Sequence, residues 1–270
     1  ARGWGHKYEP ITAMIYEAMY PGNKIDTSFG CIQHPQYSFI GASPDGIVTK
    51  GPRTGNLVEI KNTVSREIHD TPIESHWIQC QIQMEVCDLP YCDYIQTCIK
   101  EISVEDFYQE QMADYKGVIL FLQHDNESPY QTTSVDSTDT PSYKYVYMPL
   151  DYNLNSVNDE TETIIKTWIH SVTEQHPSYL LVDITYWKLE EMSCVTIPRN
   201  REWFHSVLPK FKAIWEKVEH ARIHGYEQFA PKKRTGNTTP NQELIRSFQV
   251  SLLQENNISS SDQDLPLEQT

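Results

Sequence analysis

Residues 41–61 read GASPDGIVTKGPRTGNLVEIK, and this stretch decides the fold. Two strand-like segments, 45–50 and 56–61, are separated by Gly and Pro residues that favour a turn. The pattern is that of a β-hairpin with a loop longer than the minimum. We therefore expect two antiparallel strands here, and any sheet that also contains parallel strands must be mixed.

An acid pair and a lysine lie in this hairpin. If the hairpin is symmetric about Pro52, Asp45 and Glu59 are opposed, and their carboxylates repel each other. A Mg²⁺ ion removes that penalty, because it prefers carboxylate oxygens together with a substrate phosphate. Strand alternation puts Lys61 on the face of Glu59 and Ile60 on the other face. The segment predicts a site that aims a water at phosphate; the alternative is an ordinary turn and an exposed strand.

Apolar periodicity and turn residues divide the rest of the chain into helices and strands. The expected elements are a helix over 8–20, a strand over 37–41, a helix between Pro72 and Asp88, a strand over 91–102, a helix over 104–113, strands over 117–122 and 143–148, a helix over 158–175, a strand over 180–188 and a helix over 201–224. This order predicts an α/β fold with a central mixed β-sheet flanked by helices.

The domain organisation follows from composition. One folded domain is expected over residues 1–230, with the motif-bearing core in 1–103 and an extension in 104–230. Residues 231–270 are polar and poor in core residues, so we expect this tail to be largely disordered. Because the chain begins at Ala1 without a methionine, an N-terminal piece is expected to be missing.

The net charge of −15 is unevenly distributed. Residues 62–198 contain six Lys and Arg against 23 Asp and Glu, whereas residues 199–234 contain nine against four. Local potential attracts phosphate, so the overall acidity does not exclude a nucleic acid. The six cysteines form no CxxC pair and no zinc-finger spacing, which favours reduced thiols in an intracellular, cytoplasmic protein that is not secreted.

Four motifs together resemble the PD-(D/E)xK nucleases, and among them the lambda-type exonucleases of the viral recombinase family. The motifs are WGHKYE at residues 4–9, SPDG at 43–46 followed by EIK at 59–61, NTVSRE at 62–67 and WIQCQIQMEV at 77–86. The resemblance covers roughly residues 2–100, and the style of the chain resembles a copy from a large DNA virus.

The resemblance implies a restriction-endonuclease-like core followed by a C-terminal α/β extension. It implies a Mg²⁺-dependent exodeoxyribonuclease, with Mn²⁺ as a substitute, that degrades duplex DNA from a 5′ end in the 5′ to 3′ direction. The setting would be viral DNA recombination and repair in the host cytoplasm. The family also implies a homo-oligomer and a single-strand annealing or recombination partner, without a membrane.

The resemblance also assigns roles to individual residues. The implied metal ligands are Asp45, Glu59, Glu9 and the backbone carbonyl of Ile60. Lys61 would orient or activate the attacking water, and Gln79 would brace Lys61 or the nucleophile. Ser43 would help to bind the terminal 5′-phosphate. The family's phosphate-binding arginine lies upstream of the matching region, so Arg2 is the candidate to replace it, and Arg66 is a second candidate.

Several of these residues also have a purely structural interpretation. Glu9 could be an acid favoured at a helix start, Gln79 and Gln83 could form a solvated helix face, and Arg66 could be a lone surface residue. Two other functions stay open: a structure-selective endonuclease on DNA or RNA, and a non-catalytic interaction protein on a nuclease scaffold. Dependence on a 5′-phosphate separates the first from an exonuclease. The acid pair with its lysine disfavours the second, because a binding module does not need them.

Overall fold

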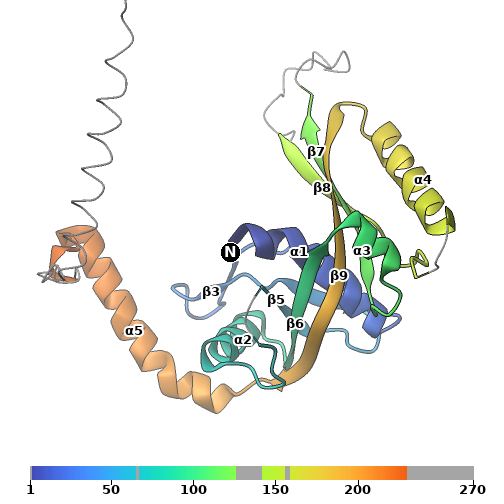
Figure 1. Cartoon of the computed structure of the whole chain (residues 1–270). Helices are drawn as coiled ribbons and strands as arrows, with labels where there is room; N and C mark the ends of the chain where they lie inside the picture. Colours follow the sequence, from blue (N-terminus) through green and yellow to red (C-terminus); the bar gives the residue numbers. More distant parts are fainter. Residues whose placement is uncertain (1, 65–66, 126–141, 156–158, 230–270) are drawn as a thin grey trace, which may run out of the picture. The chain divides into compact units, whose positions relative to one another are not determined.

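The computed structural model describes residues 2–64, 67–125, 142–155 and 159–229 (Figure 1). The chain divides into two compact units, Ala1–Lys212 and Ala213–Thr270. The predicted tail lies outside the described residues. No helix in the described part of the chain is long and apolar enough to cross a membrane.

The first unit contains the sheet and its covering helices. The helices among the described residues are α1 (Arg2–Met19), α2 (Glu74–Cys87), α3 (Val104–Gln109), α4 (Asp159–Gln175), α5 (Arg201–His224) and the 3₁₀ helix η1 (Glu227–Phe229). The strands are β1 (Lys24–Asp26), β2 (Ile32–Gln33), β3 (Gly41–Ala42), β4 (Gly46–Lys50), β5 (Leu57–Thr63), β6 (Tyr91–Ile102), β7 (Lys116–His124), β8 (Tyr143–Tyr147) and β9 (Tyr179–Pro198).

Seven strands form one sheet in the order β1-β4-β5-β6-β9-β7-β8. β5 and β6 are parallel and are connected by α2, as a parallel pair requires. The other neighbours in this sheet are antiparallel. The predicted α/β class with a mixed central sheet is therefore confirmed. β9, β7 and β8, which lie in the predicted extension, are strands of the same sheet as β4 and β5.

Some predicted elements differ from the observed ones. The strand expected over 37–41 is wrong: residues 37–40 form a turn in which Ile40 N donates to Tyr37 O at 2.8 Å. The helix expected over 104–113 ends at Gln109. β9 runs to Pro198, ten residues beyond the predicted 188, because it pairs with β6 along its C-terminal half.

The hairpin has the register that its sequence predicts. Gly46 pairs with Val58, and the same register places Asp45 opposite Glu59. The loop of the hairpin is anchored to Asp93 of β6, which is fully buried. Asp93 accepts hydrogen bonds from Tyr16, from Arg53 at 2.7 Å, from Asn56 at 3.0 Å and from Thr196 at 2.6 Å. A buried carboxylate needs this degree of pairing, and the network fixes the loop that sets the register.

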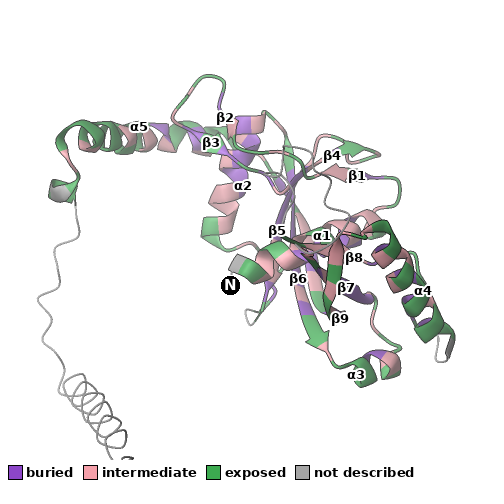
Figure 2. Cartoon of the chain, turned by 90° about the horizontal axis from the view of Figure 1, so that it is seen from above, coloured by how far each residue is buried: buried purple, intermediate pink, exposed green. Residues whose placement is uncertain are grey.

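Side chains of β5 alternate between two helices, one on each face of the sheet. Val58 packs with Tyr16 of α1, whereas Leu57 packs with Cys80 and Met84 of α2. Figure 2 shows that the central strands are largely buried between these layers. Because the alternation has a period of two, Glu59 shares the α2 side of the sheet with Leu57.

Candidate active site

Glu59 is the buried centre of the candidate site. Its side chain is 0% exposed. Oε1 accepts a hydrogen bond from the Lys61 ammonium, and Oε2 accepts one from the Gln83 amide Nε2 at 2.8 Å. An unpaired buried carboxylate costs several kcal/mol, so these two donors are the reason that the charge is tolerated.

Asp45 lies directly before β4 and points across the hairpin to β5. Its Oδ2 accepts a hydrogen bond from the backbone N–H of Ile60 at 2.7 Å. Burial, and after it the negative charge of Glu59, raise the pKa of Asp45 to about 7, against the lowering effect of the Ile60 hydrogen bond. The predicted repulsion between the two carboxylates is therefore present, and a cation bound between them would relieve it.

Lys61 connects the acid pair to α2. Besides Glu59, its Nζ contacts Gln79 Oε1 at 3.2 Å, and its side chain is 24% exposed. The ammonium therefore reaches both the buried carboxylate and solvent. This geometry suits a group that meets a substrate, since a fully buried lysine could not reach a phosphate.

Gln83 is a site residue whose contact with the acid pair was not predicted from the sequence. The side chain is 3% exposed, so the alternative of a solvated face is wrong for it. Its Nε2 donates to Glu59 and, at 3.3 Å, to the backbone carbonyl of Ser43. Its Oε1 has no hydrogen-bond partner among the described residues. The available signal was the four-residue spacing from Gln79, which puts both amides on one helix face.

Glu9 approaches the acid pair from α1. It is half-buried, and its pKa is raised by burial, lowered by His6 and raised by the charge of Glu59. Because Lys61 also lowers this pKa, the three charged groups share one electrostatic neighbourhood. The interpretation as a helix-start acid is wrong, since α1 begins at Arg2 and Glu9 lies in the third turn.

A second set of residues that the sequence did not predict holds α1 against β5. Asn62 Oδ1 accepts hydrogen bonds from Thr12 at 2.6 Å and from Thr97 at 2.7 Å. Asn62 Nδ2 donates to the carbonyl of Gly5 at 3.2 Å. Because Gly5 and Thr12 flank Glu9 on the same helix, these contacts fix the approach of Glu9 to the site.

The residues predicted to bind the DNA end are only partly described. Ser43 is exposed, and its backbone carbonyl contacts Gln83. Arg2 begins α1, but its side chain is not among the described groups, and Arg66 lies outside the described residues. The roles of these three residues stay predictions.

The described residues contain no group of three or more His, Cys, Asp or Glu side chains that could hold a metal ion. The acid pair nevertheless offers the right kind of ligand, because carboxylate and carbonyl oxygens suit a hard cation. The six cysteines are free thiols.

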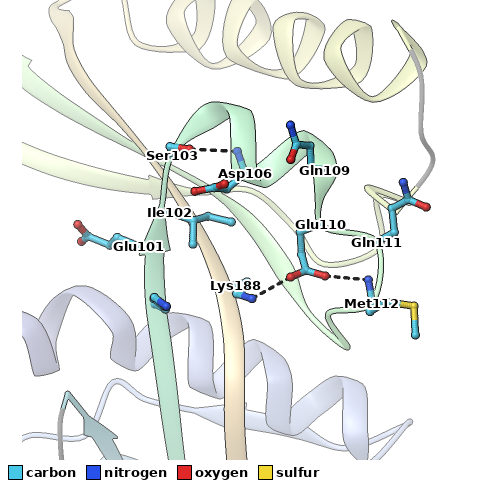
Figure 3. A pocket seen from close by; sticks show the side chains of 10 residues that line it. Glu101, Ile102, Ser103, Asp106, Gln109, Glu110, Gln111, Met112 and Lys188 are labelled. Carbon is cyan, nitrogen blue, oxygen red and sulfur yellow. Dashed lines mark hydrogen bonds and ion pairs between the residues drawn. The ribbon is translucent and has the colours of Figure 1, made fainter.

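A separate open pocket of about 680 Å³ lies where β6 ends and α3 begins (Figure 3). Its charged groups largely satisfy one another: Lys188 donates to Glu110 at 2.8 Å, and Glu110 also accepts from the backbone N–H of Met112. None of the predicted site residues is among the described residues that line it. The candidate site therefore stays at β4, β5 and α2.

Comparisons with known proteins find one family model, a viral relative and two solved structures that this chain resembles. An uncharacterized protein of Acanthamoeba polyphaga mimivirus is 30% identical over 244 residues, which is 82% of this chain and 44% of that protein. The chain thus spans less than half the length of that relative, which comes from a large DNA virus. Two crystal structures of the alkaline exonuclease LHK-Exo from Laribacter hongkongensis, one of them in complex with dAMP, are 18% identical and cover 63% of this chain. The matched regions cover 67% and 72% of the two exonuclease chains, and the TM-scores are 0.29 and 0.28.

Residues 1–90 match the YqaJ-like viral recombinase domain, which confirms the resemblance to the viral recombinase family for this part of the chain.

Proposed function

We propose that the protein is a metal-dependent deoxyribonuclease that hydrolyses phosphodiester bonds of duplex DNA as a 5′ to 3′ exonuclease. The observation that carries the proposal is the juxtaposition of Asp45, Glu59 and Lys61, with Glu59 bound to Gln83 of α2. A purely structural hairpin has no reason to place a half-buried carboxylate opposite a buried one, beside a partly exposed ammonium.

The donor set fits Mg²⁺, or Mn²⁺ in its place. Asp45, Glu59 and the backbone carbonyl of Ile60 would hold the ion, and Glu9 would lie near a second ion or its waters. The pKa of Asp45, raised by burial and by Glu59, supports this assignment, because a bound cation would stabilise both carboxylates in the charged form. When bound, such an ion would neutralise phosphate charge and make a water more acidic.

The side chains of the protein would do the remaining work. The Lys61 ammonium would orient the attacking water and offset the charge that builds on the phosphoryl oxygens. Gln79 would hold Lys61 in place through the contact between its Oε1 and Lys61 Nζ, 3.2 Å long. Water would attack phosphorus in line with the leaving oxygen, and the bond between phosphorus and that oxygen would break.

The biological setting is part of the same proposal. The match of residues 1–90 to a viral recombinase domain and the mimivirus relative support a function in viral DNA recombination or repair, in the host cytoplasm. A duplex with a 5′ end would be the substrate. A single-strand annealing partner and a homo-oligomer belong to this proposal as well.

The test is digestion of linear duplex DNA that is labelled at either end, with Mg²⁺ or with EDTA, comparing 5′-phosphate with 5′-hydroxyl ends. We expect label loss from phosphorylated 5′ ends that EDTA and Glu59→Gln both abolish. Glu17→Gln is the matched control, because Glu17 pairs with Lys24. Internal cuts that do not depend on the end would indicate the endonuclease. No metal-dependent cleavage of DNA or RNA would indicate the interaction protein.

A further inference from the structure

We infer that residues 198–201, which connect β9 to α5 and are here called the β9–α5 junction, position the active-site glutamines by clamping α2 from the side opposite to the site. The inference rests on the proposed nuclease function. It gives the C-terminal half of the chain, which lies outside the matched residues 1–90, a part in the active site.

Gln81 is the first contact of the clamp. It is 1% exposed and lies on α2 between Gln79 and Gln83. Its Nε2 donates to the carbonyl of Pro198 at 3.0 Å, and its Oε1 accepts from the backbone N–H of Asn200 at 2.6 Å. The Nε2 and the Oε1 of Gln81 are thus both hydrogen-bonded to the backbone of the junction. A shift of the junction would therefore move α2 with it.

Arg199 is the second contact, at the C-terminal end of α2. Its side chain is 6% exposed; Nε donates to Glu85 at 2.7 Å and Nη1 donates to Asp88 at 2.6 Å. Asp88 ends the helix in a left-handed conformation, with φ of 52°. The guanidinium therefore lies where a helix favours positive charge, and its two carboxylate partners compensate its burial.

Apolar contacts complete the clamp. Trp203, in the first turn of α5, lies edge-on to Trp77 of α2 with 5.0 Å between ring centroids. Phe204 and Leu208 pack with Val86 of α2 in one buried cluster. The junction and the start of α5 thus contact α2 from its first turn to its last, and the sheet covers the opposite side through Met84.

This arrangement has a direct consequence for the site. Gln79 and Gln83 contact Lys61 at 3.2 Å and Glu59 at 2.8 Å. A displacement of α2 by about 1 Å would take both pairs beyond hydrogen-bond distance. A misplacement of that size can lower a rate by roughly a hundredfold. Gln81 and Arg199 do not touch the acid pair, so they are positioning residues.

The experiment compares Gln81→Met, Arg199→Ala and Arg199→Lys with wild type by kcat and KM on linear duplex DNA with Mg²⁺. We expect kcat to fall roughly ten- to hundredfold in Gln81→Met and Arg199→Ala, with KM little changed. Arg199→Lys should recover part of the loss. Lys210→Ala is the control: Lys210 is an exposed cation on α5, outside the junction, and we expect wild-type rates from it.

A double-mutant cycle separates positioning from general destabilisation. If Arg199 acts through α2, Arg199→Ala should lower kcat much less in a background that already contains Gln79→Ala and Gln83→Ala. Equal losses in the two backgrounds, or an unchanged kcat in Arg199→Ala, would overturn the inference.

A second readout does not depend on activity. The side-chain amide protons of Gln83 should exchange slowly with solvent in wild type and fast in Arg199→Lys and Gln81→Met, as followed by NMR. Slow exchange in all three proteins would overturn the inference even if wild type cleaves no DNA, whereas the absence of cleavage by wild type contradicts only the proposed function. If Arg199→Ala does not fold, Arg199→Lys and Gln81→Met give the same comparisons.

Discussion

The side-chain amide of Gln83 lies 2.8 Å from the carboxylate of Glu59, and both groups are buried. The contact joins α2 to β5 directly at the acid pair. It means that the charge of Glu59 is held by two elements, the strand that also carries Lys61 and the helix that also carries Gln79. Substitutions in β5 or in α2 that remove one of these donors should therefore affect the same carboxylate, that of Glu59.

Gln83→Ala is expected to destabilise the fold and slow the reaction. A buried hydrogen bond to a charged group contributes about 1.5–3 kcal/mol, and its loss leaves Glu59 with one donor fewer. Urea unfolding measures the difference. Gln175→Ala is the control, because Gln175 makes its hydrogen bond to Ser171 on an exposed helix surface. Equal stabilities of the two variants would show that the Gln83 contact does not stabilise the buried carboxylate.

Asp45 should make the metal-free protein less stable as pH rises. Its pKa is raised by burial and by Glu59 from 3.8 to about 7. Between these two pH values the folded protein keeps a proton that the unfolded chain has lost. The contribution of Asp45 to the free energy of unfolding therefore falls from about pH 4 to about pH 7, and it stays at its lowest value above pH 7. Asp45→Asn keeps an acceptor for Ile60 N–H and removes this loss of stability.

We therefore expect Asp45→Asn in EDTA to gain stability relative to wild type between about pH 5 and about pH 8, as measured by urea unfolding. A difference between the two proteins that is constant over this pH range would contradict the raised pKa.

Glu9→Gln and Glu59→Gln should respond differently to added Mg²⁺. Glu9 is half-buried at the edge of the site, so its loss should raise the Mg²⁺ concentration that gives half-maximal cleavage, and excess Mg²⁺ should restore most of the rate. Glu59 is buried at the centre, and its variant should stay inactive at every concentration. Cleavage rates in a Mg²⁺ titration test this, with Glu17→Gln on the same helix as control. If added Mg²⁺ restored the cleavage rate of Glu59→Gln, Glu59 would not be a ligand of the metal ion.

Mg²⁺ should also stabilise the folded protein, because an ion that binds only the folded state shifts the unfolding equilibrium. At roughly a hundred times the Kd the gain is about 2.7 kcal/mol. Thermal unfolding with Mg²⁺ and with EDTA measures it, and Asp45→Asn should lose most of the difference. A wild-type Tm that does not respond to Mg²⁺ or Mn²⁺ would argue against a metal site.

The hairpin could be predicted because its determinants are local. Turn residues and alternation set the register of β4 and β5, and that register places Asp45 opposite Glu59. β1 and β2 were missed because strands of three and two residues carry too little alternation to be recognised. The helix α1 begins at Arg2, earlier than predicted. Its first turns contain two glycines, which are poor helix formers, so the helical signal of the sequence is too weak there.

The parts of the site that could not be predicted depend on contacts between distant residues. Gln83 is buried because α2 packs against the sheet, where Gln83 meets Glu59 and the carbonyl of Ser43. The ion pair between Glu85 and Arg199 joins residues 114 positions apart, and no local sequence pattern predicts it. The extra length of β9 has the same origin, because it is set by pairing with β6.

The place of β9 beside β6 has a consequence for how the protein is made. The ladder joins Tyr91 to Pro198, so a ribosome completes every predicted catalytic residue about a hundred codons before it completes the strand that covers β6. At roughly 5–20 residues per second, the edge of β6 stays open for several seconds. Pairings between such distant residues also form slowly. The candidate site is therefore expected to assemble only after synthesis has passed residue 198, and a chain stopped earlier would present an unpaired strand to other chains.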